Sequence, residues 1–203
     1  MTLPTWRTIA IIAAAVAGVL LLGLGGWFWT SVQQQRGMAA YAETLTRARQ
    51  GQAPEVRMGA ILGLEGVLAQ YPSNAMAAQA AYELGNLRFA ANEYDKARAA
   101  YQVAIVKAGS GTLGTLARAG IGYAWEAERK FGDALQAYQR ALADLKPTAF
   151  YYEELLVDVA RVQALNGKKD DAVATYRRIL KDFPKSARAD DIRNRLATLG
   201  AAP

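Results

Sequence analysis

The feature that most limits how this chain can fold is a series of alanines at nearly constant spacing. Ala60, Ala97, Ala134 and Ala172 follow one another at intervals of 37, 37 and 38 residues. Around each alanine, apolar residues recur with the 3.6-residue period of amphipathic helices, and short polar turns interrupt that period. Because one pair of helices cannot bury its apolar faces alone, a repeat of this length predicts a stack of similar helical units.

The second unit, at 78–111, shows the internal pattern most clearly. Small residues at Gly85, Ala97 and Ala104 allow two helix backbones to approach closely, and Tyr94 and Tyr101 fill the space beside them. A small-residue helix A, a turn, and a helix B with an alanine followed four residues later by an aromatic resemble the tetratricopeptide repeat.

This resemblance implies an all-α, right-handed solenoid of about four helical hairpins. We expect it to occupy residues 37–203, with hairpins at 41–74, 78–111, 115–148 and 153–186. The first of these has the most degenerate sequence, as a terminal repeat should. A last amphipathic helix at 186–199, with Ile192, Leu196 and Leu199 facing inward, is expected to cap the stack.

An uncharged apolar segment, IAIIAAAVAGVLLLGLGGWFW, fills residues 9–29. As a helix it spans about 31 Å, the thickness of the hydrocarbon core of a bilayer, and tryptophans flank it at both ends. A cleaved signal peptide is the alternative. However, the apolar run is long for one, and the nearest A-x-A pattern, at 40–42, lies far downstream. We predict that residues 1–36 form a retained single transmembrane anchor, and that Gly37 breaks the helix before the first hairpin.

The positive charges beside the anchor are nearly balanced, with Arg7 on one side and Arg36, Arg47 and Arg49 on the other. Counted alone, they slightly favour a cytoplasmic repeat domain. Single N-terminal anchors in bacteria nevertheless usually leave the short amino end inside, and long domains translocate largely regardless of charge. We expect a single-pass protein of the bacterial inner membrane whose repeat domain is periplasmic.

A stripe of small residues lies on one face of the expected anchor. Ala10, Ala14 and Gly18 are spaced i, i+4 and i+8, so another membrane helix could approach closely there. In a segment this rich in alanine and glycine, composition alone can produce such a stripe. Both interpretations stay open from the sequence.

The composition argues against catalysis. The chain contains neither cysteine nor histidine, which removes the thiolate ligands, the commonest general base and the commonest transition-metal ligand. Its acidic pairs, such as Glu153-Glu154, consist of adjacent helical residues that point about 100° apart and do not converge on a substrate. We expect no enzyme activity, cofactor or metal. The net charge of +6 comes from interleaved signs, and we expect neither nucleic acid nor a small-molecule ligand.

The concave face of the solenoid is the candidate binding site. With the repeats in register, this face receives Tyr82, Asn86 and Phe89 from the second hairpin, Tyr123 and Glu126 from the third, and Asp158 and Arg161 from the fourth. Aromatic rings beside a few polar groups suit an extended or helical peptide. The alternative is that the aromatic residues only pack between neighbouring helices. A rival site for anionic lipid is the basic cluster Arg177, Arg178, Lys181, Lys185 and Arg188.

The sequence YPSNAMAAQAAYELGNLRF and the stretches FGDALQAYQRAL and ILKDFPKSARADDIRNRL resemble repeats of bacterial envelope tetratricopeptide proteins. These are the Tol-Pal coordinating and outer-membrane assembly families. An N-terminal anchor before such repeats is similar to the ancillary subunit of the Sec translocon. The resemblance implies a non-catalytic scaffold or adaptor that binds other proteins in an envelope assembly. The alternative is a structural accessory subunit of an energy-transducing membrane complex, held mainly by its transmembrane helix.

Overall fold

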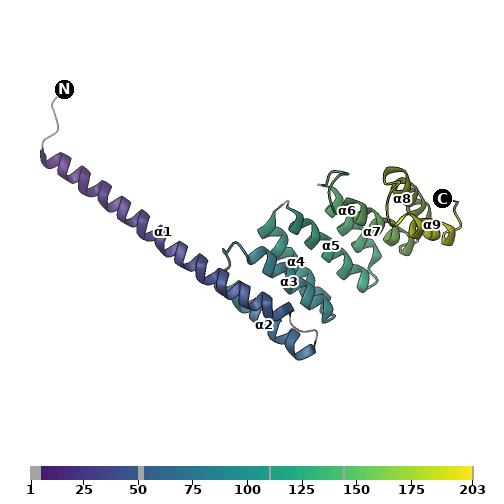
Figure 1. Cartoon of the computed structure of the whole chain (residues 1–203), viewed down its shortest axis with the longest axis horizontal. Helices are drawn as coiled ribbons and strands as arrows, with labels where there is room; N and C mark the ends of the chain where they lie inside the picture. The colour runs from purple at the N-terminus through teal and green to yellow at the C-terminus, as the bar shows by residue number, and fades with distance from the viewer. Residues whose placement is uncertain (1–5, 50–52, 110, 144, 203) are drawn as a thin grey trace, which may run out of the picture.

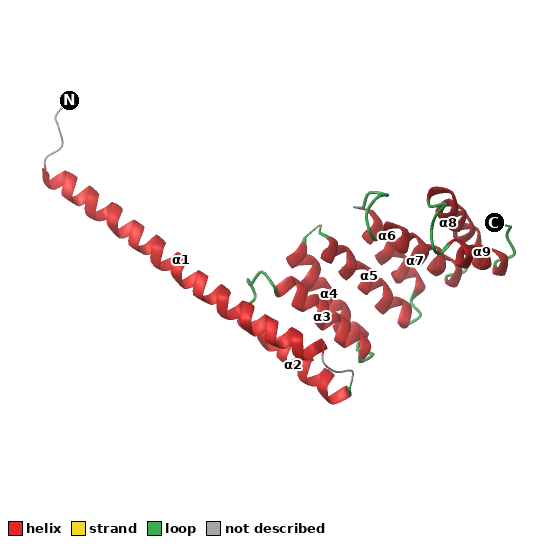
Figure 2. Ribbon diagram, viewed as in Figure 1, coloured by secondary structure: helices red, strands yellow, loops and turns green. Residues whose placement is uncertain are grey.

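The computed structural model describes residues 6–49, 53–109, 111–143 and 145–202. Within these ranges the chain forms nine helices and no strand (Figures 1 and 2). In chain order the helices are α1 (Trp6–Arg49), α2 (Pro54–Gln70), α3 (Ala77–Ala90), α4 (Tyr94–Ala108), α5 (Thr112–Ala127), α6 (Phe131–Ala143), α7 (Tyr152–Leu165), α8 (Lys169–Asp182) and α9 (Ala189–Thr198).

The helices form the predicted row of hairpins. The pairs α3–α4, α5–α6 and α7–α8 are the second, third and fourth hairpins, and the C-terminal part of α1 pairs with α2 as the first. Helix α9 closes the far end, where Ile192 and Leu196 are fully buried. The all-α solenoid with a C-terminal capping helix is therefore confirmed.

Close packing of glycine against tyrosine holds the central hairpins together. A Cβ atom at Gly85 would lie 2.5 Å from the ring of Tyr101, and one at Gly122 would lie 2.4 Å from the ring of Tyr138. Both tyrosines are buried. The glycine in helix A thus makes the space that the tyrosine of helix B fills. The alanines that mark the repeat, Ala60, Ala97, Ala134 and Ala172, are also buried, as the register assigned from the sequence predicts.

The turns inside these hairpins use a left-handed residue at the same place in each repeat. Asn92 and Arg129 have φ of 60°, and Gly167 has φ of 76°. This conformation reverses the chain in the few residues between helix A and helix B. It is ordinary for glycine, tolerated by asparagine, and unfavourable for arginine. Arg129 adopts it nonetheless, with its guanidinium 5.7 Å from the centre of the Phe131 ring.

Gly37 does not break the first helix, contrary to the prediction. Helix α1 runs through it without interruption to Arg49, and Gly37 is buried. A Cβ atom there would lie 2.6 Å from Nδ2 of Asn74, which donates a hydrogen bond of 2.9 Å to the main-chain carbonyl of Gln34. The glycine provides room for a close contact between α1 and the α2–α3 loop. The expected anchor and the first hairpin consequently share one helix.

The N-terminal half of α1 has a different environment. It projects away from the solenoid (Figure 1), and its large apolar side chains, among them Leu22 at 79% and Trp27 at 69%, are exposed. By length and composition, the helix within Ala13–Ala48 could cross a membrane, and none of its most apolar window is buried. A membrane anchor and a signal sequence both satisfy this criterion.

Candidate partner-binding cleft

A cleft of about 640 Å³ opens on the concave side of the central repeats. Six of the seven side chains that the repeat register placed on this face line it. The lining residues are Tyr82, Asn86, Phe89, Tyr101, Tyr123, Glu126, Ala127 and Arg161. They come from α3, α4, α5 and α7, so the stacking of three consecutive hairpins creates the site.

The aromatic residues of the cleft have two roles at once. The ring of Tyr82 lies 5.8 Å from that of Tyr101, and the ring of Tyr123 lies 5.4 Å from that of Tyr138. Phe89 makes an edge contact at 5.4 Å with Tyr94. Tyr82, Phe89 and Tyr123 are nevertheless only partly buried. Each ring packs one side against the helices behind it and leaves another side open to the cleft, so packing between helices and availability for binding do not exclude each other.

Tyr101 is a cleft residue that the sequence analysis did not identify. It belongs to helix B of the second hairpin, whereas the concave face was assigned to helix A residues. Its ring reaches the cleft because Gly85 and Gly120 have no side chains there: a Cβ at Gly120 would lie 2.6 Å from the tyrosine ring. The Tyr101 hydroxyl donates a 2.9 Å hydrogen bond to Oδ1 of Asn86. The two glycines on adjacent helices A are the signal that could have revealed it.

Asp158 lies behind the cleft wall and does not line it. It is 3% exposed and accepts a 2.7 Å hydrogen bond from the Tyr123 hydroxyl. Arg161 donates to the other carboxylate oxygen of Asp158 at 2.5 Å and also forms an ion pair with Glu126. Glu126 accepts a further hydrogen bond, of 2.9 Å, from Tyr138. The Arg161 guanidinium thus pairs with both carboxylates and holds the polar edge of the cleft, formed by Glu126 and Arg161, in position.

Burial affects the protonation of this network. It raises the pKa of Asp158 from its ordinary value of 3.8 to about 6; the hydrogen bond from Tyr123 opposes this shift, and the nearby charge of Glu154 adds to it. Burial likewise raises the pKa values of Tyr101, Tyr123 and Tyr138 above the ordinary value. Near neutral pH these hydroxyls therefore stay protonated and act as hydrogen-bond donors.

The stripe of small residues in α1 remains open to other molecules. Ala10 and Ala14 are exposed, and a Cβ atom at Gly18 would meet no atom within 4 Å. The structure neither fills nor covers this face.

The C-terminal basic cluster is partly neutralised. Arg178 pairs with Asp182 at 3.2 Å, Arg188 pairs with Glu154, and Arg177 donates to the carbonyl of Ala202. Lys181 and Lys185 are exposed and form no ion pair with another described residue. The cluster contains fewer available cations than the sequence indicated.

Chemically, the cleft offers aromatic surface and fixed hydrogen-bonding groups. The described residues contain no group of three or more acidic side chains placed to hold a metal ion. Rigid rings beside an ion pair are suited to holding a peptide.

The sequence profile of the tetratricopeptide repeat-like domain matches residues 4–201, nearly the whole chain. The chain belongs to this family. The match includes the apolar part of α1 as well as the repeats, so both lie within the unit that the family shares. Tetratricopeptide folds typically mediate protein interactions and are generally not catalytic. No curated protein sequence matches the chain closely enough to count as a relative.

Solved structures share the fold of this family member at low sequence identity. The apo form of RapI has a TM-score of 0.70 at 11% identity; the alignment covers 83% of this chain and 49% of RapI, so the chain spans about half the length of that protein. TPR-like repeats of a putative kinesin light chain from Podosopora anserina reach 0.62 at 15% identity, covering 82% and 86%. MamA reaches 0.54 at 20%, covering 66% and 67%. These similarities concern the fold alone.

Proposed function

We propose that the protein is a non-catalytic, membrane-anchored scaffold that binds an extended or helical segment of a partner protein in the cleft. The observation that carries this proposal is the convergence of Tyr82, Phe89, Tyr101 and Tyr123 around one cleft on three stacked hairpins. Aromatic side chains bury a large area and lose little conformational entropy on binding. The proposed setting is a bacterial inner-membrane assembly, with the repeats in the periplasm.

The continuity of α1 favours a retained anchor over a cleaved signal sequence. Cleavage after the A-x-A pattern at 40–42 would remove Gln34, Gly37 and the fully buried Tyr41 from the first hairpin. It would also leave the carbonyl of Tyr71 without the hydrogen bond that the Tyr41 hydroxyl donates to it. A signal peptide does not normally supply core side chains of the mature domain.

Site-specific photocrosslinking tests the cleft. A photoreactive amino acid is placed at Tyr82 or Phe89 of the full-length protein, with a control at Val103 of α4, which is 41% exposed and does not line the cleft. We expect the two cleft positions to crosslink to the same protein and the control position to crosslink to none. Equal crosslinking from all three positions would contradict a specific cleft.

An accessory subunit held by its membrane helix is the second candidate, because the apolar side chains of α1 are exposed and its small-residue stripe is open. A photoreactive residue at Val19 discriminates between the two. Crosslinks from Val19, together with none from Tyr82 or Phe89, would favour this candidate. Protease added to spheroplasts tests the side of the membrane: the repeats should be digested while a cytoplasmic control protein stays intact.

A further inference from the structure

The unbroken α1 helix determines which end of the hairpins faces the bilayer. Gln34 contacts the α2–α3 loop through the main-chain carbonyl of Ser73 and through Asn74. Gln34 follows Trp29, the end of the apolar segment, by only five positions, which is about 8 Å along a helix. The headgroup layer extends roughly 5–8 Å beyond the hydrocarbon core. If α1 crosses a membrane as proposed above, the α2–α3 loop lies at the headgroups.

All connections from a helix B to the next helix A lie at this same end, because the hairpins are antiparallel and α1 is the first helix A. Figure 1 shows the α2–α3 and α4–α5 connections on the side toward which α1 projects. We call this end the proximal rim: loops 71–76, 145–151 and 183–188, with the last turns of α4 and α8. The opposite end, formed by the turns within the hairpins, is the distal rim.

The two most exposed large apolar side chains of the described chain beyond residue 30 both lie on the proximal rim. Phe150, in the α6–α7 loop, is 92% exposed, and Val106, in the last turn of α4, is 74% exposed. Phe150 lies beside Ser186 and Ala187 of the next loop, where these residues line a shared hollow. The fold does not account for a phenylalanine held almost entirely outside the core.

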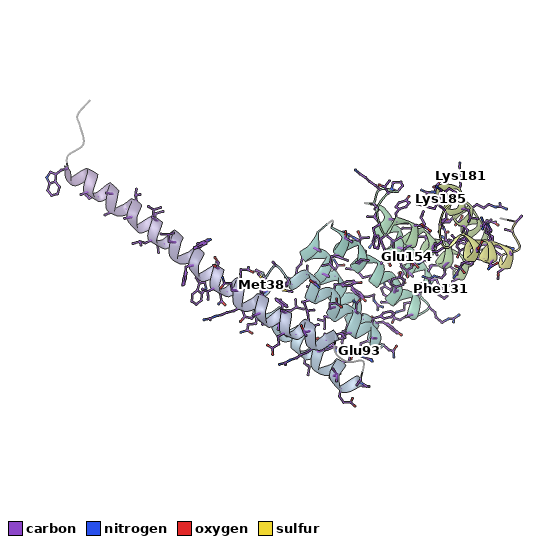
Figure 3. The ribbon with its side chains drawn as sticks, in the orientation of Figure 1. Met38, Glu93, Phe131, Glu154, Lys181 and Lys185 are labelled. Atoms are coloured by element: carbon purple, nitrogen blue, oxygen red, sulfur yellow. The ribbon has the colours of Figure 1, made fainter. Side chains whose placement is uncertain are left out.

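The lysines of the two rims differ in how far neighbouring acids neutralise them. Lys146, Lys181 and Lys185 are exposed on the proximal rim, and no described residue forms an ion pair with them. At the distal rim, acidic and basic side chains alternate instead. Lys96 pairs with Glu93 at 3.1 Å, Lys130 pairs with Glu128 at 3.6 Å, and Lys168 and Lys169 directly precede Asp170 and Asp171. Figure 3 shows Lys181 and Lys185 on the opposite side of the solenoid from Glu93. Exposed lysines beside an exposed aromatic ring are the pattern of a surface that meets anionic lipid.

We propose that the proximal rim docks on the anionic surface of the bilayer that α1 crosses, with Phe150 inserted among the headgroups. This inference rests on the proposed membrane anchoring. Docking holds the row of hairpins along the membrane. Since transmembrane helices tilt by about 20° on average, a continuous α1 permits this approach without a hinge.

The chain contains no cysteine, so single cysteines can carry an environment-sensitive NBD dye. Full-length Phe150→Cys is compared with Leu165→Cys, a 50% exposed apolar position at the distal end of α7, and with Val19→Cys in the apolar part of α1. Each labelled protein is placed in nanodiscs of neutral lipid or of lipid with roughly 30% anionic phosphatidylglycerol. We expect the dye at 150 to shift to the blue and brighten about twofold or more in anionic discs, and the dye at 165 to stay unchanged.

A matched pair of charge reversals tests the lysines. In the Phe150→Cys background, Lys181→Glu with Lys185→Glu should abolish the difference between the two disc types. Lys168→Glu with Lys169→Glu, at the distal rim, should preserve it.

The outcomes separate the two proposals. A dye in lipid at Val19 but in water at position 150 in both disc types overturns docking and leaves the anchor intact. A dye in water at Val19 overturns the anchor and docking together. Docking is also overturned if both pairs of charge reversals reduce the difference between the two disc types equally. The attraction to anionic lipid would then depend on the net charge of the protein and not on the proximal rim.

Discussion

The first and third hairpins follow the same repeat but take their buried aromatic residue from different helices. In the third, Tyr138 of helix B is fully buried over Gly122 of helix A. In the first, the buried aromatic is Tyr41 of helix A, and the close glycine is Gly63 of helix B, where a Cβ atom would lie 2.9 Å from Thr44. The buried aromatic residue of a hairpin can therefore come from either helix, and in the first hairpin the close glycine faces a threonine and not that aromatic ring.

This difference follows from what each helix must contact. A tyrosine on helix B can reach the next hairpin, as Tyr101 does when it fills the space at Gly120 of α5. Tyr41 instead ties its own hairpin to the loop behind it, since its hydroxyl donates 3.1 Å to the carbonyl of Tyr71. The tyrosine of helix B thus joins neighbouring central hairpins, whereas Tyr41 joins α1 to the loop that follows α2.

The largest expected effect comes from removing the tyrosine of the third hairpin. Tyr138→Ala should lower the free energy of unfolding by about 3–5 kcal/mol, because it deletes a fully buried aromatic ring and leaves a cavity over Gly122. Tyr138→Phe keeps the ring and loses the hydroxyl bond to Glu126, so it should cost about 1–2 kcal/mol. Urea unfolding of the full-length protein, followed by circular dichroism, measures both. Equal losses for the two variants would show that the ring does not fill the interface.

The next largest effect is a pH dependence of stability. It arises from Asp158 of the fourth hairpin, which is bonded to Tyr123 of the third, and the first hairpin has no part in it. The folded state binds the Asp158 proton more tightly than the unfolded chain, because burial raises the pKa to about 6. The contribution of the protonated Asp158 carboxyl to the free energy of unfolding is therefore fully present below about pH 4. It is lost as the pH rises through about 6. Relative to Asp158→Asn, the wild type should lose about 1–3 kcal/mol between pH 4 and 7.

Urea unfolding at several pH values measures this difference, and Asp133→Asn, at an exposed position of α6, is the control. A wild type that gains stability over Asp158→Asn as the pH rises would mean that the ion pair with Arg161 outweighs burial.

The smallest effect distinguishes two glycines of the first hairpin. Gly66→Ala in α2 should stabilise by up to about 1 kcal/mol, because alanine favours the helix and a Cβ there meets nothing within 4 Å. Gly37→Ala in α1 should instead be about 1 kcal/mol destabilising, because its Cβ displaces Asn74 and disturbs two hydrogen bonds to Gln34. Thermal melts of the two variants compare them directly. Stabilisation by both substitutions would indicate that the contact between α1 and the α2–α3 loop is loose.

The spacing of small and aromatic residues was enough to predict the repeat and its register. The marker alanines are fully buried where two helices pack closely: Ala97, Ala134 and Ala172. Their spacing equals the length of one hairpin. The same register placed Tyr82, Phe89 and Tyr123 on one concave face, since residues at equivalent repeat positions face the same way. Local periodicity was sufficient for these inferences because helix A and helix B contact each other within one repeat.

Features that depend on contacts between distant segments could not be predicted from the spacing and are seen only in the folded chain. Gly37 has low helix propensity, yet α1 continues through it, and the side chain of Asn74 packs where a Cβ atom would lie. Asp158 looks like another groove carboxylate, yet neighbouring helices bury it behind Tyr123. Tyr101 enters the cleft because glycines 35 residues apart, Gly85 and Gly120, leave the same space empty. Propensity describes a residue and its chain neighbours, whereas burial and close approach depend on which surfaces the fold brings together.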